Sequence, residues 1–256
     1  MNIRLSLLCP LICLSCALAQ EPGDGTAPAA EGEALKARDF NVDFSACTEF
    51  VGIGFVPAAN ARPLVPSQFT LAGDSTNAVI VVRVAECADV VVDGHHEGKT
   101  RTSQIGISIL GGDTTAAINN YTLWVSTTSA QLKAKLTAAG AKAYLAKTLD
   151  YRISGGTLSI ASSSAQTPSF AVKGAASFPT AAAVPFSASW WVVGNHGTIQ
   201  ARTAFPAIQF GSSTTVLTTP CGSELATLIG GTSLTFPALD SYNAFATAHL
   251  EVRDTD

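Results

Sequence analysis

The distribution of hydrophobic and polar residues predicts a chain built mainly from β-strands. Residues 104–110 alternate clearly, with Ile105, Ile107 and Ile109 on one face, and 78–92 is a long run dominated by Val and Ile. Alternation with a period of two is typical of strands that bury one face. Strands are predicted at 47–56, 69–72, 78–92, 104–110, 119–125, 143–153, 156–162, 170–174, 186–193, 198–205, 214–217 and 246–252.

Helical patterns are few and short. The clearest is 127–139, where Thr128 or Ser129 can cap the N-terminus and Gly140 follows the C-terminus. Shorter helices are predicted at 58–64 and 223–229. Because helices do not separate the strands regularly, antiparallel pairing is favoured, and about ten strands usually curl or close to remove exposed edges. The predicted fold class is mainly β (α+β), a curled or closed antiparallel β-barrel with a few short peripheral helices; a two-sheet sandwich is the alternative.

Residues 1–19 have the pattern of a secretory signal peptide. Arg4 precedes the short apolar core 5–14, and Ala17-Leu18-Ala19 is a small-x-small cleavage site. The core is shorter than the about 20 apolar residues that span a bilayer. The sequence therefore predicts a secreted protein, extracellular or periplasmic; a retained membrane anchor and a lipid-modified Cys16 are the alternatives.

The segment after the signal changes in character at about residue 44. Residues 20–43 are rich in Gly, Ala, Pro and Glu and predict a flexible leader, which leaves 44–256 as one β-barrel-like domain. Only 13% of the chain is charged, against about 25% in typical proteins, and the formal net charge is −4. Since no block of Lys and Arg occurs, the sequence predicts no nucleic-acid partner and, once the signal is removed, no membrane contact. It leaves the oligomeric state open.

Cleavage of the signal leaves three cysteines, Cys47, Cys87 and Cys221, so at most one intrachain disulfide can form. Cys47 and Cys87 bracket a predicted strand–helix–strand unit. If its two strands pair antiparallel, the start of one lies beside the end of the other, which suits a disulfide. We therefore predict a Cys47–Cys87 bridge and a free Cys221, in keeping with an oxidising compartment.

Aromatic residues in the predicted strands are the candidates for a ligand site. Neighbouring strand residues point to opposite faces, so one ring of Trp190-Trp191 must face inward. His249 lies on the last predicted strand, where it can line the barrel interior. We expect Tyr121, Trp124, Trp190 and His249 to bind a small apolar ligand in an internal cavity. The alternative is that these side chains only fill a core.

The sequence assigns no metal, no cofactor and no catalytic residue. His95-His96 stands in the polar segment 93–97, expected to be a solvated loop, and His196 is expected in a hairpin turn. No Gly-x-Ser-x-Gly elbow, phosphate-binding loop or dinucleotide fingerprint occurs. Asn120-Tyr121-Thr122 is an acceptor sequence for N-glycosylation at Asn120.

Four segments together resemble the opening of the acetoacetate decarboxylase-like β-barrel superfamily. They are 47–52 (Cys-Thr-Glu-Phe-Val-Gly), 61–66 (Ala-Arg-Pro-Leu-Val-Pro), the strand 79–87 and 119–124 (Asn-Asn-Tyr-Thr-Leu-Trp). The likeness extends loosely from about residue 45 to residue 250, and it is closer to secreted relatives than to the enzyme itself. It implies a barrel that encloses an apolar cavity.

The same resemblance implies a chemistry whose motif is missing here. Enzymes of this superfamily use a lysine as a Schiff-base nucleophile, beside a second lysine and after a Tyr-Pro pair. This chain has no Tyr-Pro-Lys-Lys and no two adjacent lysines. We interpret it as an exported barrel that binds a small apolar molecule. An enzyme of this fold with altered chemistry and a structural surface or matrix protein are the alternatives.

Overall fold

The computed structural model describes residues 39–194 and 197–255. The predicted signal peptide and residues 20–38 of the predicted leader lie outside this part. The predicted boundary at residue 44 needs correction, because strand β1 (Phe40–Pro57) begins before it. Phe40 and Val42 are buried, and Val42 pairs with Leu250 on one side and Val92 on the other. These residues therefore belong to the folded sheet.

Strands make up most of the described chain. After β1 they are β2 (Thr70–Leu71), β3 (Asn77–Val92), β4 (His95–His96), β5 (Thr100–Leu110), β6 (Ile118–Thr127), β7 (Ala143–Leu145), β8 (Thr148–Ser154), β9 (Thr157–Ser163), β10 (Phe170–Ser177), β11 (Val184–Gly194), β12 (Gly197–Gln209), β13 (Ser212–Thr218), β14 (Ser233–Thr235) and β15 (Leu239–Asp254). The helices are α2 (Ala58–Ala61), the 3-10 turn η1 (Arg62–Leu64), α3 (Ala130–Ala138) and α4 (Glu224–Ile229).

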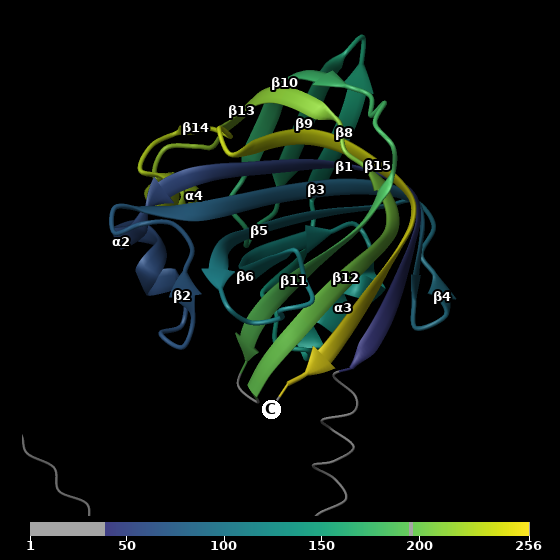
Figure 1. Cartoon of the computed structure of the whole chain (residues 1–256), viewed down its shortest axis with the longest axis horizontal. Coiled ribbons are helices and arrows are strands. Elements are labelled where there is room, and N and C mark those ends of the chain that lie inside the picture. Colours follow the sequence, from purple (N-terminus) through teal and green to yellow (C-terminus); the bar gives the residue numbers. More distant parts are fainter. Residues whose placement is uncertain (1–38, 195–196, 256) are drawn as a thin grey trace, which may run out of the picture.

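Seven strands close into a barrel in the order β5-β3-β1-β15-β12-β11-β6, with β6 paired back to β5 (Figure 1). Each neighbouring pair is antiparallel except β6 and β11, which run parallel. The predicted closed β-barrel is confirmed, and only its antiparallel description needs this correction. A parallel pair requires a long crossover, and the chain between β6 and β11 indeed forms α3 and β7 to β10.

A second sheet covers one side of the barrel. Its order is β14-β13-β10-β9-β8, and Figure 1 shows it above the long strands β1, β3 and β15. Phe50 and Val84 of the barrel share one buried cluster with Leu158, Val172 and Leu217 of this sheet. The second sheet thus packs face to face on the barrel, as two sheets do in the sandwich that was the alternative prediction.

A second buried cluster fills one end of the barrel interior. Phe44 from β1 shares this cluster with Leu132 and Leu136 of α3, so the helix closes that end. Ser129 caps α3, because its Oγ accepts the Leu132 N–H at 2.9 Å. Gly140 follows with a φ of +96°, a conformation that favours glycine. The predicted helix is confirmed, with Ser129 as its cap.

Cys47 and Cys87 form the predicted disulfide. They are direct partners on the antiparallel strands β1 and β3, with their Cα atoms 4.1 Å apart, and both are buried in the cluster that contains Phe44. Cys221 is free and exposed, as predicted. A disulfide fits an oxidising compartment. No helix within the described residues is long and apolar enough to cross a membrane.

Several predicted strands have different limits in the structure, and two of them show the physical reason. The segment 143–153 is divided into β7, which pairs with β6 of the barrel, and β8, which pairs with β9 of the second sheet. The last strand begins at Leu239 rather than 246, because β1 continues to pair with it up to Ile53. Both differences come from partners that are distant in the sequence, which no local pattern reveals.

Candidate functional site

The barrel interior contains a cavity of about 150 Å³, here called the lumen cavity. Its wall comes from β1, β3, β6, β11, β12 and β15, because every second residue of a strand points to the same face. The lining residues are Glu49, Val51, Ile53, Val81, Arg83, Ile118, Phe186, Ala188, Trp190, Thr203, Phe205, Phe210, Leu239 and Asn243. Most of them are apolar, as the superfamily resemblance implies.

Trp190, one of the predicted ligand-binding residues, is buried in the wall of the lumen cavity. It lies against Gly106 of β5, where a Cβ would stand 2.7 Å from a ring carbon of the indole. Residue 106 must therefore be glycine for the indole to keep this place. Trp191 has a different environment: its Nε1 donates to Asn119 Oδ1 at 2.9 Å, and its ring centre lies 6.3 Å from that of Phe69.

One part of the lumen cavity is polar. Arg83 Nε donates to Glu49 Oε2 at 2.7 Å, and Asn243 Nδ2 donates to Glu49 Oε1 at 3.4 Å. Glu49 is only 3% exposed, so the carboxylate depends on these two partners. Asn243 Oδ1 is buried and has no hydrogen-bond partner in the described part of the chain. A buried acceptor without a donor is costly, and a ligand with a donor group removes this cost.

Sequence reasoning missed Glu49, Arg83 and Asn243. A signal existed for the first two, since each is a charged residue inside an apolar strand, where burial almost always requires a partner. Asn243 carries no such signal, because the predicted last strand begins after it.

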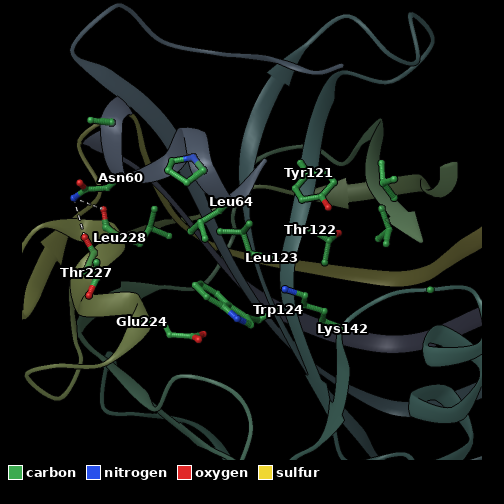
Figure 2. A pocket seen from close by; sticks show the side chains of 15 residues that line it. Asn60, Leu64, Tyr121, Thr122, Leu123, Trp124, Lys142, Glu224, Thr227 and Leu228 are labelled. Atoms are coloured by element: carbon green, nitrogen blue, oxygen red, sulfur yellow. Dashed lines mark hydrogen bonds between the residues drawn. The ribbon is translucent and has the colours of Figure 1, made fainter. Parts of the chain in front are cut away.

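Tyr121 and Trp124 line a second cavity, of about 560 Å³, between α2, η1, β6, β11 and α4. We call this space the outer cleft. Figure 2 shows Leu64, Leu123 and Trp124 near its centre, with Asn60 at one side, where Asn60 Nδ2 donates to the Thr227 carbonyl at 2.8 Å. Burial raises the pKa of the Tyr121 hydroxyl. The structure thus divides the predicted aromatic residues between two separate cavities.

His249 lines neither cavity. Its side chain is about half exposed, and its Nδ1 lies 2.7 Å from Asp43 Oδ1 on β1. Ala248 and Leu250 on either side are buried, so strand alternation turns His249 to the outer face. The expectation that His249 lines the barrel interior therefore needs correction.

Asn120 is fully buried in β6. Its Oδ1 accepts a hydrogen bond from Ser108 Oγ at 2.8 Å, and its Nδ2 is buried without a partner in the described residues. The folded chain consequently does not offer this amide to solvent for glycosylation, because a residue inside a closed barrel has no exposed side.

The histidine pair 95–96, predicted to lie in a solvated loop, forms the short strand β4, which pairs with the end of β3. Both residues are exposed, and His96 Nδ1 lies 2.6 Å from Asp89 Oδ2. Within 39–194 and 197–255 no three His, Cys, Asp or Glu side chains gather as metal ligands. His196 lies outside the described residues.

Comparison with known proteins gives a likeness in structure only. No family model matches the sequence, and no curated protein is similar to it. A solved acetoacetate decarboxylase aligns over 83% of this chain and 88% of its own with a TM-score of 0.56 and 9% identity. The chain has the acetoacetate decarboxylase-like fold. Two further solved structures have the same fold. The acetoacetate decarboxylase from Legionella pneumophila aligns over 83% of this chain and 85% of its own, with a TM-score of 0.53 and 10% identity. The enduracididine biosynthesis enzyme MppR with HEPES bound aligns over 92% of this chain and 94% of its own, with a TM-score of 0.54 and 12% identity.

Within this acetoacetate decarboxylase-like barrel, the lumen cavity contains no lysine among its described lining residues. Lys142 lines the outer cleft. The remaining described lysines, Lys99, Lys133, Lys135, Lys147 and Lys173, line neither cavity. The described lining of the lumen therefore offers no lysine amine to form a Schiff base with a carbonyl compound, and its polar residues are Glu49, Arg83, Thr203 and Asn243.

Proposed function

We propose that this protein is exported and binds, in its lumen cavity, a small apolar molecule that carries one hydrogen-bond donor. The observation that supports this most strongly is the buried Asn243 Oδ1, an acceptor without a partner in the described chain, on a residue that lines a mostly apolar cavity. Buried polar atoms almost always have a partner in folded proteins. A ligand hydroxyl or amine supplies one.

The size of the cavity limits the ligand. A volume of about 150 Å³ accommodates a molecule about as large as benzene. The aromatic and aliphatic wall, with Phe186, Trp190 and Phe205, favours an apolar body, since burial of apolar surface drives such binding. MppR has been solved in complex with pyruvate, so another barrel of this fold holds a small molecule.

A pair of nearly isosteric probes tests the proposal. We expect phenol to bind about tenfold more tightly than toluene, because only phenol donates to Asn243 Oδ1. Isothermal titration calorimetry measures both affinities. In Asn243→Leu the preference for phenol should disappear, and persistence of the preference contradicts the assigned acceptor.

A second pair of variants tests the place of binding. Ala188→Leu adds volume to the wall of the lumen cavity and should abolish phenol binding. The matched control is Ala175→Leu, at an exposed position of β10, which should leave the affinity unchanged. Equal phenol binding by both variants excludes the lumen cavity as the site.

The alternative of an enzyme rests on the fold, which this chain shares with decarboxylases. Borohydride reduction in the presence of pyruvate, followed by mass spectrometry, separates the two functions. We expect no covalent adduct, because no described residue in the lumen wall is a lysine. A lysine adduct would contradict the proposed binding function and support an enzyme that uses Schiff-base chemistry.

A further inference from the structure

The outer cleft has the size and lining of a ligand site in its own right. Its volume of about 560 Å³ falls in the range of sites for drug-sized molecules. Leu64, Leu123 and Val192 form apolar walls, and they come from η1, β6 and β11, which are distant in the sequence. The cleft does not share a lining residue with the lumen cavity.

One wall of the cleft is an open strand edge. The pairing of β6 with β11 ends at Tyr121, and its pairing with β7 begins at Val125. Residues 122–124 thus lack a neighbouring strand on this side, although β5 pairs with β6 on the other. The three residues all line the cleft. All three residues are largely buried, at 5–7% exposed, so the cleft is the side from which a short extended peptide reaches their backbone, as peptides do at sheet edges elsewhere.

Trp124 provides an unpartnered donor at this edge. Its side chain is buried, with 7% of the residue exposed, yet no hydrogen bond is made by its indole N–H within the described chain. The indole N–H is not among the buried unpartnered atoms of the described chain, so it reaches the space of the cleft, whereas that of Trp191 has a partner in Asn119. Figure 2 shows the nitrogen of Trp124 between the side-chain ends of Lys142 and Glu224.

Lys142 and Glu224 give the cleft two opposite charges. Both side chains are exposed and line the cleft, and neither has an ion-pair partner in the described residues. Glu224 begins α4 directly after the cap Ser223, so the capped helix start fixes the backbone position from which this side chain extends. A simple anion satisfies Lys142 but is repelled by Glu224, whereas a zwitterion satisfies both.

We propose that the outer cleft binds a peptide of two or three residues with free termini and apolar side chains. Its backbone lies along residues 122–124 of β6. Its carboxylate accepts from Trp124 Nε1 and Lys142 Nζ, its ammonium group meets Glu224, and its side chains cover Leu64 and Leu123. Since a strand advances about 3.3 Å per residue, an edge of three residues matches a peptide of this length.

The probe is the dipeptide L-leucyl-L-phenylalanine, compared by calorimetry on the full chain with three relatives: its methyl ester, its N-acetyl derivative and L-phenylalanine. We expect the free dipeptide to bind at least about tenfold more tightly than each relative, because each lacks a terminal charge or the strand-like backbone. Equal affinity for the ester or the acetylated peptide overturns the role of the termini. Equal affinity for L-phenylalanine overturns the peptide class.

Single substitutions test whether Lys142 and Glu224 bind the two termini of the dipeptide. Lys142→Met should weaken the dipeptide about three- to tenfold without changing the affinity for the methyl ester. Glu224→Gln should do the same for the dipeptide and leave the N-acetyl derivative unaffected. The matched controls are Lys173→Met on β10 and Glu251→Gln on β15, which do not line the cleft. Loss of binding in a control, or none in the cleft variants, overturns the site.

The test is independent of the lumen ligand. Ala188→Leu changes the lumen cavity and should leave dipeptide binding intact. Dipeptide binding that is lost in Ala188→Leu, or the absence of saturable dipeptide binding at millimolar concentration, overturns the inference whatever the outcome with phenol.

Discussion

The lumen cavity and the outer cleft differ in how their charged groups are paired. In the lumen, Arg83 and Asn243 both donate to Glu49, and the ion pair is nearly closed off from solvent. In the cleft, Lys142 and Glu224 are exposed and unpaired among the described residues. The first arrangement is required for folding, since a buried charge without a partner is strongly destabilising. The unpaired charges of the cleft lower the stability of the fold little, because water solvates both groups.

The two regions thus use their polar residues in different ways. The lumen pairs its two charges with each other and leaves Asn243 Oδ1 as a buried acceptor without a partner among the described residues. The cleft leaves its charges and the indole N–H of Trp124 for a ligand. Substitutions on the lumen side should consequently change stability most, and substitutions on the cleft side should change recognition most.

Removal of the disulfide should have the largest effect. Cys47→Ala combined with Cys87→Ala should lower the free energy of unfolding by about 4 kcal/mol, because the bridge closes a loop with a sequence separation of 40. Urea denaturation measures this, and Cys221→Ala is the control. We expect the double variant to lose more affinity for phenol than for the dipeptide, since the bridge lies in the barrel interior. A double variant as stable as the control contradicts the structural role.

Arg83→Leu should lower the free energy of unfolding by about 3 kcal/mol, because it leaves Glu49 buried without its cation. The value is at the lower end for buried pairs, since 12% of the Arg83 side chain is exposed. Arg152→Leu, which breaks an exposed pair with Asp150 at 3.9 Å, should cost at most about 1 kcal/mol. Equal losses in the two variants refute the contrast between buried and exposed charges.

Asp113 should make the stability of the barrel depend on pH in the acid range. Burial alone raises its pKa, but hydrogen bonds from Thr115 and Ser189 and the charge of Arg202 lower the pKa to about 2, from an ordinary 3.8. The stability that this carboxylate contributes is therefore present above pH 3.8 and lost as the pH falls toward 2. Asp113→Asn should cost about 2 kcal/mol at pH 7.

The pH profile of the same variant checks the sign. The difference in free energy of unfolding between the wild type and Asp113→Asn should shrink as the pH is lowered from 5 to 2. A constant difference over this range shows that another group accounts for the acid sensitivity.

Ser129→Ala should have the smallest effect, about 1 kcal/mol, because it removes the cap of α3 at the closed end of the barrel. Ser223→Ala removes the cap of α4 and should cost a similar amount. Only Ser223→Ala should also weaken dipeptide binding, since Glu224 follows that cap. Thermal unfolding and calorimetry on both variants test this, and weaker binding in both removes the distinction.

Several features could be predicted from local sequence because their causes are local. The long strand β3 follows from its Val and Ile residues, and α3 from a capping serine and a terminal glycine. The Cys47–Cys87 bridge follows from two strands that face each other. The exposure of His249 has a local signal in the alternation of Ala248, Leu250 and Val252 with polar neighbours, although our prediction placed this residue in the barrel interior.

The sequence by itself determined that this chain is rich in strands with a few short capped helices, because alternation and capping act over a few residues; it left a curled or closed barrel and a sandwich open. Only the tertiary structure decided which side chains meet in each cavity. Ala46, with a φ of +48°, interrupts β1, so Phe44 and Cys47 share one buried cluster although they are three positions apart. The register of β1 with β3 and β15 is the same on both sides of Ala46, so the buried face changes without an inserted residue. Barrel closure then brings Glu49, Arg83 and Asn243 together from three strands, a contact that no segment encodes alone.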